Sequence, residues 1–540
     1  LRRLIDNVLK QYLPFIKDAL PFDIRQRHGL LNSAKSLLEI HFPENLDLQK
    51  EAYRRLAFEE FFLFIIPVAL RKFKASQRPG IRHKTERELA KKFEDSLPFQ
   101  LTNAQKRVIE EIKQDMARAS AMQRLIQGDV GCGKTIVATY AAIFALQSGY
   151  QAAFMAPTEI LAKQHYEKIN SQLSALGRQW PVVSGQKKDI RVALLVSSLD
   201  KKEKEKIYQE IKNGKVDLAI GTHALLQEVV QFKNLGLVII DEQHKFGVAQ
   251  RAFLPQKGNN PDVLIMTATP IPRTLAITLY GDLDISIIDE LPPGRKPIVT
   301  RWVRQAKRRE VYQFIREKVK EGRQVYIVYP IIKESHLLDL YAAEQMYKEL
   351  KKDVFGDLRL GLVHGQMRQE LQDKTMAEFK EGKVDILVST TVLEVGIDVA
   401  NATVMVIEHA ERFGLSQLHQ LRGRIGRGGE ESFCILVSDA PTEEARARLE
   451  IMSRTNDGFR IAEEDLRLRG PGEFFGERQH GLSELRLANP LTQMRLLRQA
   501  KNEAIKLIQA DPRLESRQNQ GIKEVLKKKF PRYEESQVVG

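Results

Sequence analysis

The chain has 540 residues, 43% hydrophobic and 29% charged, a composition typical of a soluble globular protein and not of a disordered one. A chain of this length is too long to fold around a single hydrophobic core, which predicts about three or four domains. Lysine and arginine (85) exceed aspartate and glutamate (70), which fits either a polyanionic partner or an unspecialised basic surface. Two cysteines exclude a disulfide framework or cysteine-rich metal cluster and favour a cytoplasmic location.

Residues 1 to about 75 have apolar side chains at three- and four-residue spacing, which predicts helices. The longest apolar run, 61–70, includes Pro67 and is about half as long as a membrane span, so we expect a buried helix and no membrane contact. The start has no secretory signal pattern. The charged stretch 74–92 predicts a linker or an exposed basic helix. We therefore expect a helical linker region over residues 1–98.

From about residue 99, short apolar runs alternate with amphipathic segments, which is typical of βαβ units with parallel sheets covered on both faces. The stretch 291–297, Leu-Pro-Pro-Gly-Arg-Lys-Pro, divides this pattern and predicts a hinge. The fold class is therefore α/β, with parallel-sheet lobes at 99–292 and 293–440 and a helical region at 441–540. The runs expected to form strands are 125–126, 152–156, 218–220, 237–240, 263–266, 325–329, 360–363, 386–388, 404–407 and 434–437.

The segment 128–135 has the spacing of a phosphate-binding loop, G-x-x-x-x-G-K-T, between a predicted strand and a predicted helix. Glycines let backbone N–H groups face a polyphosphate, and the helix adds its positive N-terminus. Lys134 would reach the β- and γ-phosphates, and the Thr135 hydroxyl would bind Mg²⁺. We expect ATP to bind through Gly128, Asp129, Val130, Gly131, Cys132, Gly133, Lys134 and Thr135.

Two carboxylates follow the apolar run 237–240, and a buried parallel strand delivers such residues to the carboxyl edge of its sheet. Asp241 is predicted to hold Mg²⁺, largely through water, and Glu242 to polarise the attacking water as general base. Gln243 and His244 are expected to sense the γ-phosphate and to pass its state to residues 267–269.

A glycine-rich loop in the second half, 420–428, supplies the positive charge that phosphoryl transfer requires. We expect Arg424 and Arg427 to point into a cleft between the lobes as arginine fingers, with Gln420 in the same site. Since only the first lobe has a phosphate loop, we expect the second lobe to complete the ATP site of the first lobe. Lobes that close on ATP and open after hydrolysis would form a motor.

These motifs resemble those of superfamily 2 helicases, and more narrowly those of the RecG family of bacterial branch-migration helicases. The resemblance runs from about residue 70 to beyond 500. The motif at 465–473 is shared mainly with the transcription-repair coupling factor. The segments that carry the resemblance are 99–105 (FQLTNAQ), 241–248 (DEQHKFGV), 266–274 (MTATPIPRT), 390–398 (TTVLEVGID) and 465–473 (DLRLRGPGE).

The resemblance implies two RecA-like lobes that use ATP and Mg²⁺ and act on branched or double-stranded DNA. It implies that Gln105 reads the adenine. It also implies a helical hairpin and loop, containing Arg448, Arg469 and Gln479, that converts lobe closure into a step along the duplex. The DNA track would be lined by Pro157, Thr158, Gly221, Thr222, His223, Thr390 and Thr391.

Simpler interpretations of some of these residues stay open. Taken singly, a threonine at a loop end is more often a helix cap than a DNA contact. The segment 470–472, Gly-Pro-Gly, also predicts a turn joining two helices. The family carries an oligonucleotide-binding β-barrel wedge before its helical linker, whereas this chain begins in a helical pattern. We therefore do not expect junction splitting or fork preference from these residues alone.

The hypothesis from sequence is an ATP-driven translocase on double-stranded DNA that acts in branch migration and replication-fork regression, in recombination and repair. One alternative is a related motor that displaces a bound protein from DNA, and another is a nucleotide-switched DNA-binding module that does not translocate. A water-activating glutamate favours an enzyme over a switch. We expect a monomer, whereas the step size and the binding of a single-strand DNA-binding protein stay open.

Overall fold

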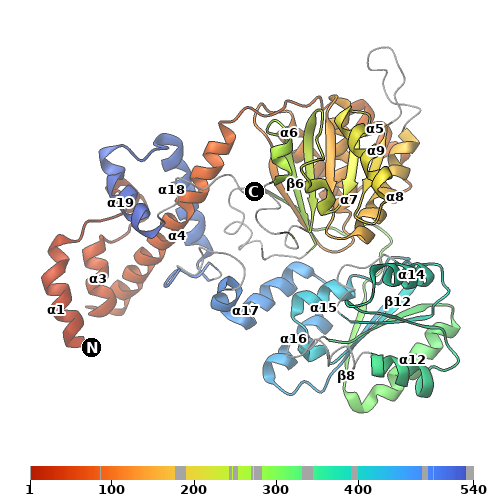
Figure 1. The fold of residues 1–540 in the computed structure, drawn as a ribbon. Coiled ribbons are helices and arrows are strands. Elements are labelled where there is room, and N and C mark those ends of the chain that lie inside the picture. The colour runs from red at the N-terminus through yellow and green to blue at the C-terminus, as the bar shows by residue number, and fades with distance from the viewer. Residues whose placement is uncertain are drawn as a thin grey trace. The chain divides into compact units, whose positions relative to one another are not determined.

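The computed structural model describes residues 2–85, 87–176, 190–242, 246, 253–268, 272, 283–330, 344–390, 399–476, 485–490 and 492–530, without the side chains at 87, 88, 176, 369 and 469–476. The described residues fall into two units. One unit combines the N-terminal helices with the C-terminal helices, and the other holds both β-sheets (Figure 1). His244, Thr391 and Gln479 lie outside the described residues.

The helical unit is organised around one long helix, α4 (Leu46–Ser76). The side chain of Asn45 accepts hydrogen bonds from the backbone N–H groups of Asp47 and Leu48, which caps the start of the helix. Its apolar run, residues 61–70, packs against α18 in a shared hydrophobic core (Figure 1), which confirms the predicted buried helix. None of the described helices is long and apolar enough to span a bilayer. The other helices of this unit are α1 (Arg2–Tyr12), α2 (Phe22–His28), α3 (Ser33–His41), α18 (Met494–Ala510) and α19 (Gln520–Lys529).

The first sheet has seven strands in the order β3-β4-β2-β5-β6-β1-β7. Its central strand β5 is buried along its whole length, as its apolar sequence requires. The strands are β1 (Gln123–Gly128), β2 (Gln151–Met155), β3 (Val192–Leu195), β4 (Leu218–Gly221), β5 (Leu235–Asp241), β6 (Asp262–Thr267) and β7 (Asp284–Ile288). The helices of this lobe are α5 (Arg87–Ser96), α6 (Asn103–Met116), α7 (Lys134–Gln147), α8 (Glu159–Leu176) and α9 (Lys201–Lys212).

The second sheet has six strands in the order β10-β11-β9-β12-β13-β8, and every neighbouring pair is parallel. The strands are β8 (Val299–Val303), β9 (Gln324–Val328), β10 (Leu360–Val363), β11 (Ile386–Ser389), β12 (Ala402–Glu408) and β13 (Phe433–Val437). The helices are α12 (Arg308–Lys320), α14 (Gln369–Lys380), α15 (Leu415–Arg422) and α16 (Glu443–Arg454). The predicted fold class is confirmed: two parallel-sheet lobes are accompanied by helical regions.

Every apolar run that we predicted to be a strand coincides with one, although the runs 152–156 and 325–329 extend one residue beyond β2 and β9. The strands β3, β7 and β8 were not predicted. All three are edge strands. Charged or polar residues interrupt the apolar sequences of β7 and β8, whereas β3 is entirely apolar but only four residues long. The predicted turn at 470–472 is wrong, because α17 (Gly458–Gly476) continues through it. The helix continues here although proline and glycine both disfavour the interior of a helix.

Candidate active site

The phosphate loop joins β1 to α7, as its sequence predicts. Gly131 and Gly133 have φ angles of 79° and 89°, in the left-handed region that other residues rarely adopt. A Cβ at Gly133 would collide with the amide nitrogen of Gln105, so a side chain at this position would have to displace Gln105. This backbone, followed directly by a helix N-terminus, fits a bound polyphosphate.

Lys134 is the first residue of α7, and its side chain is buried. Its Nζ donates hydrogen bonds to the carbonyl oxygens of Gly128 at 2.8 Å and Asp129 at 3.0 Å. The ammonium group is therefore held against the loop that is predicted to bind the phosphates. Thr135 follows in the first helical turn and is half-buried. Its position at the helix start suits a hydroxyl ligand for Mg²⁺ beside the phosphates.

Gln105 lies in the first turn of α6 and is buried. Its Oε1 accepts from the Thr102 backbone N–H at 2.9 Å, and its Nε2 donates to the Cys132 carbonyl oxygen at 2.8 Å. The side chain thus forms a capping box and also ties the helix to the phosphate loop. Adenine recognition by Gln105 remains an implication of the resemblance.

The predicted pair of carboxylates lies where β5 ends. Asp241 Oδ2 lies 3.0 Å from Nε2 of His165, which belongs to α8. Burial favours the neutral form of Asp241, but the hydrogen bond and charge of His165 and the charge of Lys134 outweigh it and lower its pKa. Among the described residues, no three His, Cys, Asp or Glu side chains gather as a metal site. The binding of Mg²⁺ by Asp241, largely through water, stays the prediction made from the sequence.

Glu242 has a left-handed backbone, with φ at 49°. Its Oε1 and Oε2 accept from the Ala268 backbone N–H at 3.2 and 3.3 Å, which joins the carboxylate to the segment after β6. Burial and the charge of Asp241 raise the pKa of Glu242 to about 7, against the opposing charges of Lys134 and Arg424. A carboxylate with a pKa near neutrality is well suited to act as a general base. Gln243 and His244, the expected phosphate sensors, are not described.

The glycine-rich loop that follows α15 carries both expected arginine fingers. Arg424 belongs to the second lobe, yet its charge acts on Glu242 of the first lobe, so the two groups are electrostatic neighbours. Arg427 donates from Nε and Nη2 to the Gly423 carbonyl oxygen at 3.3 Å each. Burial and the charge of Arg295 lower the pKa of Arg427 to about 10. Gln420 is buried in the last turns of α15.

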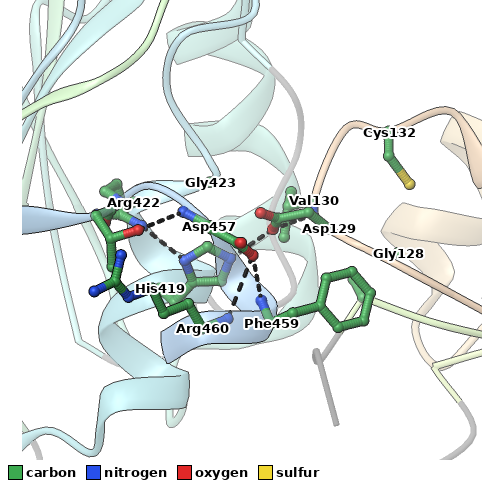
Figure 2. A network of polar contacts seen from close by, with 12 residues as sticks. Gly128, Asp129, Val130, Cys132, His419, Arg422, Gly423, Asp457, Phe459 and Arg460 are labelled. Carbon is green, nitrogen blue, oxygen red and sulfur yellow. Dashed lines mark hydrogen bonds and ion pairs between the residues drawn. The ribbon is translucent and has the colours of Figure 1, made fainter. Parts of the chain in front are cut away.

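A chain of hydrogen bonds connects the phosphate loop to the second lobe (Figure 2). His419 Nε2 lies 2.5 Å from Asp129 Oδ1, and His419 Nδ1 lies 2.9 Å from Arg422 Nη2. Because an arginine only donates, Nδ1 must accept, and the proton on Nε2 is donated to Asp129. Burial pushes the pKa of Asp129 upward, but the hydrogen bond from His419 outweighs this effect, so the pKa of Asp129 is lowered.

Arg422 extends this chain to the segment between α16 and α17. It is buried, and its Nη1 donates to the carbonyl oxygens of Met452 and Thr455, each at 2.9 Å. Two residues later, Asp457 caps α17 by accepting from the Phe459 backbone N–H at 2.9 Å (Figure 2). The loop that would hold the phosphates is therefore connected to the start of α17 through side chains and one short backbone segment.

The expected DNA-track residues lie at the carboxyl ends of strands. Pro157 and Thr158 follow β2, Gly221 is the last residue of β4, and Thr390 follows β11. Thr222 and His223 come directly after Gly221. Thr158 Oγ1 accepts from the Leu161 backbone N–H at 3.4 Å, so this threonine is a helix cap, as the simpler interpretation predicted. Thr222 and Thr390 are buried, and their hydroxyl groups have no hydrogen-bond partner among the described residues. His223 is exposed.

The expected coupling residues are only partly described. Arg448 lies on α16, and its Nη2 donates to the Glu411 carbonyl oxygen at 3.1 Å. Arg469 lies on α17, without a described side chain, and Gln479 is not described. Sequence reasoning missed four residues of the site: His165, Arg295, His419 and Arg422. Of these, only His419 and Arg422 had a local signal, since they lie beside or within the glycine-rich loop.

Three family models match the chain. The model for the DEAD/DEAH box helicase matches residues 102–277, and the helicase conserved C-terminal domain matches residues 306–429. The model for domain 3, C-terminal, of the ATP-dependent DNA helicase RecG matches residues 455–532.

Curated relatives extend the similarity over almost the whole chain. An ATP-dependent DNA helicase RecG from Synechocystis is 48% identical over 94% of this chain and 60% of the relative. RecG from Bacillus subtilis is 47% identical over 95% of this chain and 73% of the relative. A solved structure of RecG bound to a three-way DNA junction is 46% identical, with a TM-score of 0.70 over 92% of this chain and 64% of that protein. The chain thus spans about three-fifths to three-quarters of the length of these proteins.

Proposed function

The chain belongs to the RecG family of ATP-dependent DNA helicases, and from this we propose that it hydrolyses ATP to move along double-stranded DNA. Its substrate would be branched DNA, and its role branch migration and the regression of replication forks in recombination and repair. The similarity to a RecG that binds a three-way junction supports this substrate. Because DNA is the substrate, we propose that the chain acts in the cytoplasm, where bacterial chromosomes lie.

One observation carries the proposal: charged groups of both lobes act on the same few residues. The charge of Arg424 acts on Glu242, and His419 contacts Asp129 in the phosphate loop. A pure DNA-binding module has no need to bring a second lobe to a raised-pKa carboxylate. A motor does need this arrangement, because its two lobes must close when ATP binds between them and open after hydrolysis.

The positions of these residues in the site suggest a chemical role for each of them. The loop backbone and Lys134 would bind the β- and γ-phosphates, and Glu242 would accept a proton from the attacking water. Thr135 and Asp241 would hold Mg²⁺, which neutralises negative charge on the phosphates when bound. Arg424 and Arg427 would stabilise the charge that develops on the departing phosphate, with Gln420 beside them.

The DNA contacts are proposed on the family resemblance. Seven residues would contact the sugar-phosphate backbone of DNA without recognising its base sequence. They are Pro157, Thr158, Gly221, Thr222, His223, Thr390 and Thr391. Arg448, Arg469 and Gln479 would couple lobe closure to a step along the duplex. The chain of contacts from Asp129 through Arg422 supports such coupling, since it leads from the phosphate loop to the start of α17.

The decisive experiment combines two assays on the same preparation. ATP hydrolysis is measured with duplex, forked and four-way-junction DNA, and translocation is measured as displacement of a triplex-forming strand. We expect DNA-stimulated hydrolysis and displacement, both lost in Glu242→Gln. Gln479→Ala should keep hydrolysis and lose displacement. ATP-dependent DNA binding without any displacement would instead support the nucleotide-switched module.

Two further assays test the remaining expectations. Displacement of a DNA-bound protein roadblock, without junction migration, would favour the alternative motor. Sedimentation of the chain with and without a single-strand DNA-binding protein tests both the expected monomer and that possible second partner.

A further inference from the structure

Arg295 lies in the segment 291–297 that joins the two lobes, and it contacts the phosphate loop. Its Nη1 donates a hydrogen bond to the Val130 carbonyl oxygen at 2.5 Å. A Cβ built on Gly131 would collide with the same nitrogen, so the guanidinium group lies directly against the loop at this glycine. The positive φ of Gly131 and the absence of its side chain thus make room for Arg295.

The same part of the loop is also contacted by the second lobe. His419 binds the Asp129 carboxylate, and a Cβ at Gly423 would collide with Val130, so α15 and the residue after it lie close against the loop. We call residues 129–131 the loop apex. The apex is therefore held by three contacts, two from the second lobe and one from the segment between the lobes. Of these three contacts, only that of Arg295 is made to a backbone atom of the apex, the Val130 carbonyl oxygen.

The charges around the apex indicate what else Arg295 does. Burial lowers the pKa of Arg295, and the Asp129 charge opposes this effect. The charge of Arg295 in turn lowers the pKa of both Arg427 and Arg422, after the larger effect of burial. Arg295 is thus close enough to repel both Arg427 and Arg422, beside the phosphate loop that Lys134 follows. A polyphosphate is the ligand that would relieve this repulsion.

We propose that Arg295 is a positioning residue for nucleotide binding: by holding the Val130 carbonyl group, it fixes the loop apex to the segment between the lobes. The conformation of that segment and occupancy by a nucleoside triphosphate are then coupled through one hydrogen bond. This inference rests on the proposed ATPase function. It assigns a role in nucleotide binding to a residue outside the phosphate loop, the carboxylate pair and the arginine fingers.

The first test compares Arg295→Ala and Arg295→Lys with Lys296→Ala, a change of the next residue, which is exposed. KM and kcat for DNA-stimulated hydrolysis are measured, together with binding of a fluorescent ADP without DNA. We expect Arg295→Ala to raise KM about tenfold, the size that a hydrogen bond from a charged donor supports, with kcat changed less than about twofold. Arg295→Lys should recover part of the affinity, and Lys296→Ala should match the unmodified chain.

An Arg295→Ala variant with unchanged KM and unchanged ADP affinity would overturn the inference. A loss of kcat alone would also overturn it, because Arg295 would then act on the reaction and not on binding. Failure of the unmodified chain to bind or hydrolyse ATP is a different result, which refutes the proposed function itself. The melting temperature of each variant, without nucleotide, separates a general loss of stability from a change in affinity.

The second test uses the crowding at Gly131. Gly131→Ala must displace the guanidinium group of Arg295 and also strain the left-handed backbone. In an Arg295→Ala background only the backbone strain remains. We therefore expect the combined rise in KM for the double variant to be smaller than the product of the two single effects. Full multiplicative additivity would show that the two residues act independently and would overturn the inference.

Discussion

His165 Nε2 lies 3.0 Å from Asp241 Oδ2, so a side chain of α8 holds the carboxylate at the end of β5. Both groups are buried, and His165 also lies against the Phe154 ring. The helix that follows the expected DNA-track residues Pro157 and Thr158 is thereby joined to the expected Mg²⁺ ligand. An aspartate oriented by a second side chain is a common way to keep a metal ligand in place.

We predict that His165→Ala raises the Mg²⁺ concentration needed for half-maximal hydrolysis, by about 10-fold or more, the range seen when such supporting groups are removed. ATP hydrolysis titrated with Mg²⁺ measures this directly. His41→Ala, a change of an exposed histidine on α3, is the matched control. An unchanged Mg²⁺ requirement in His165→Ala would show that Asp241 does not depend on this contact.

The two residues expected to handle phosphate and water should fail in different ways. Lys134→Ala removes the ammonium group from the loop, so we predict loss of both nucleotide binding and hydrolysis. Glu242→Gln keeps the shape of the side chain but removes the base, so we predict near-normal binding and a fall in kcat of about 10²–10⁴-fold. Equilibrium binding and steady-state hydrolysis distinguish the two, with Glu228→Gln, an exposed site, as control. Normal turnover in either variant would remove the site assignment.

The arginine fingers should affect the chemical step more than binding. For Arg424→Ala and Arg427→Ala, we predict a fall in kcat of about 10²–10³-fold with a small change in ADP affinity, because their charge is needed as charge develops on the phosphate. Arg309→Ala, an exposed arginine on α12, is the control. If both variants lost ADP affinity and kept kcat, the two residues would be ground-state ligands and not fingers.

Acid stability should depend on Asp511, at the end of α18. Its carboxylate accepts from the Ser516 Oγ at 2.7 Å and the Asn519 Nδ2 at 2.8 Å, as well as from two backbone N–H groups. Burial raises its pKa, but these hydrogen bonds outweigh burial and hold the pKa well below its usual value of 3.8. A carboxylate with a lowered folded-state pKa stabilises the protein above the unfolded-state pKa and loses this effect as pH falls towards the folded-state pKa.

We therefore predict that Asp511→Ala melts at a lower temperature than the unmodified chain near neutral pH. The difference should shrink as pH falls below about 4, because the native carboxylate then begins to lose its advantage. Melting curves measured across this range test the sign. A difference that grew towards low pH would contradict the lowered pKa.

The local motifs could be predicted because each is made of neighbours in the chain. The glycines before Lys134 shape a loop whatever surrounds them, and the apolar run before Asp241 forms a buried strand that ends at the carboxylates. The buried run in α4 and most strands also follow from short-range patterns of apolar residues. The edge strands β7 and β8 were missed because charged or polar residues interrupt their apolar runs, and β3 was missed although its four residues are apolar. The expected turn at 470–472 is instead part of the continuous helix α17.

By itself the sequence determined the fold class, the phosphate loop, the carboxylate pair and the glycine-rich loop with its two arginines. Each of these depends on the spacing of residues that are close together in the chain. Only the tertiary structure decided that His165 holds Asp241, that His419 holds Asp129, and that Arg295 holds Val130. The partners in these pairs are 76, 290 and 165 residues apart. No local pattern encodes such pairs, because they form only when strands, helices and lobes pack and bring distant polar groups within hydrogen-bonding distance.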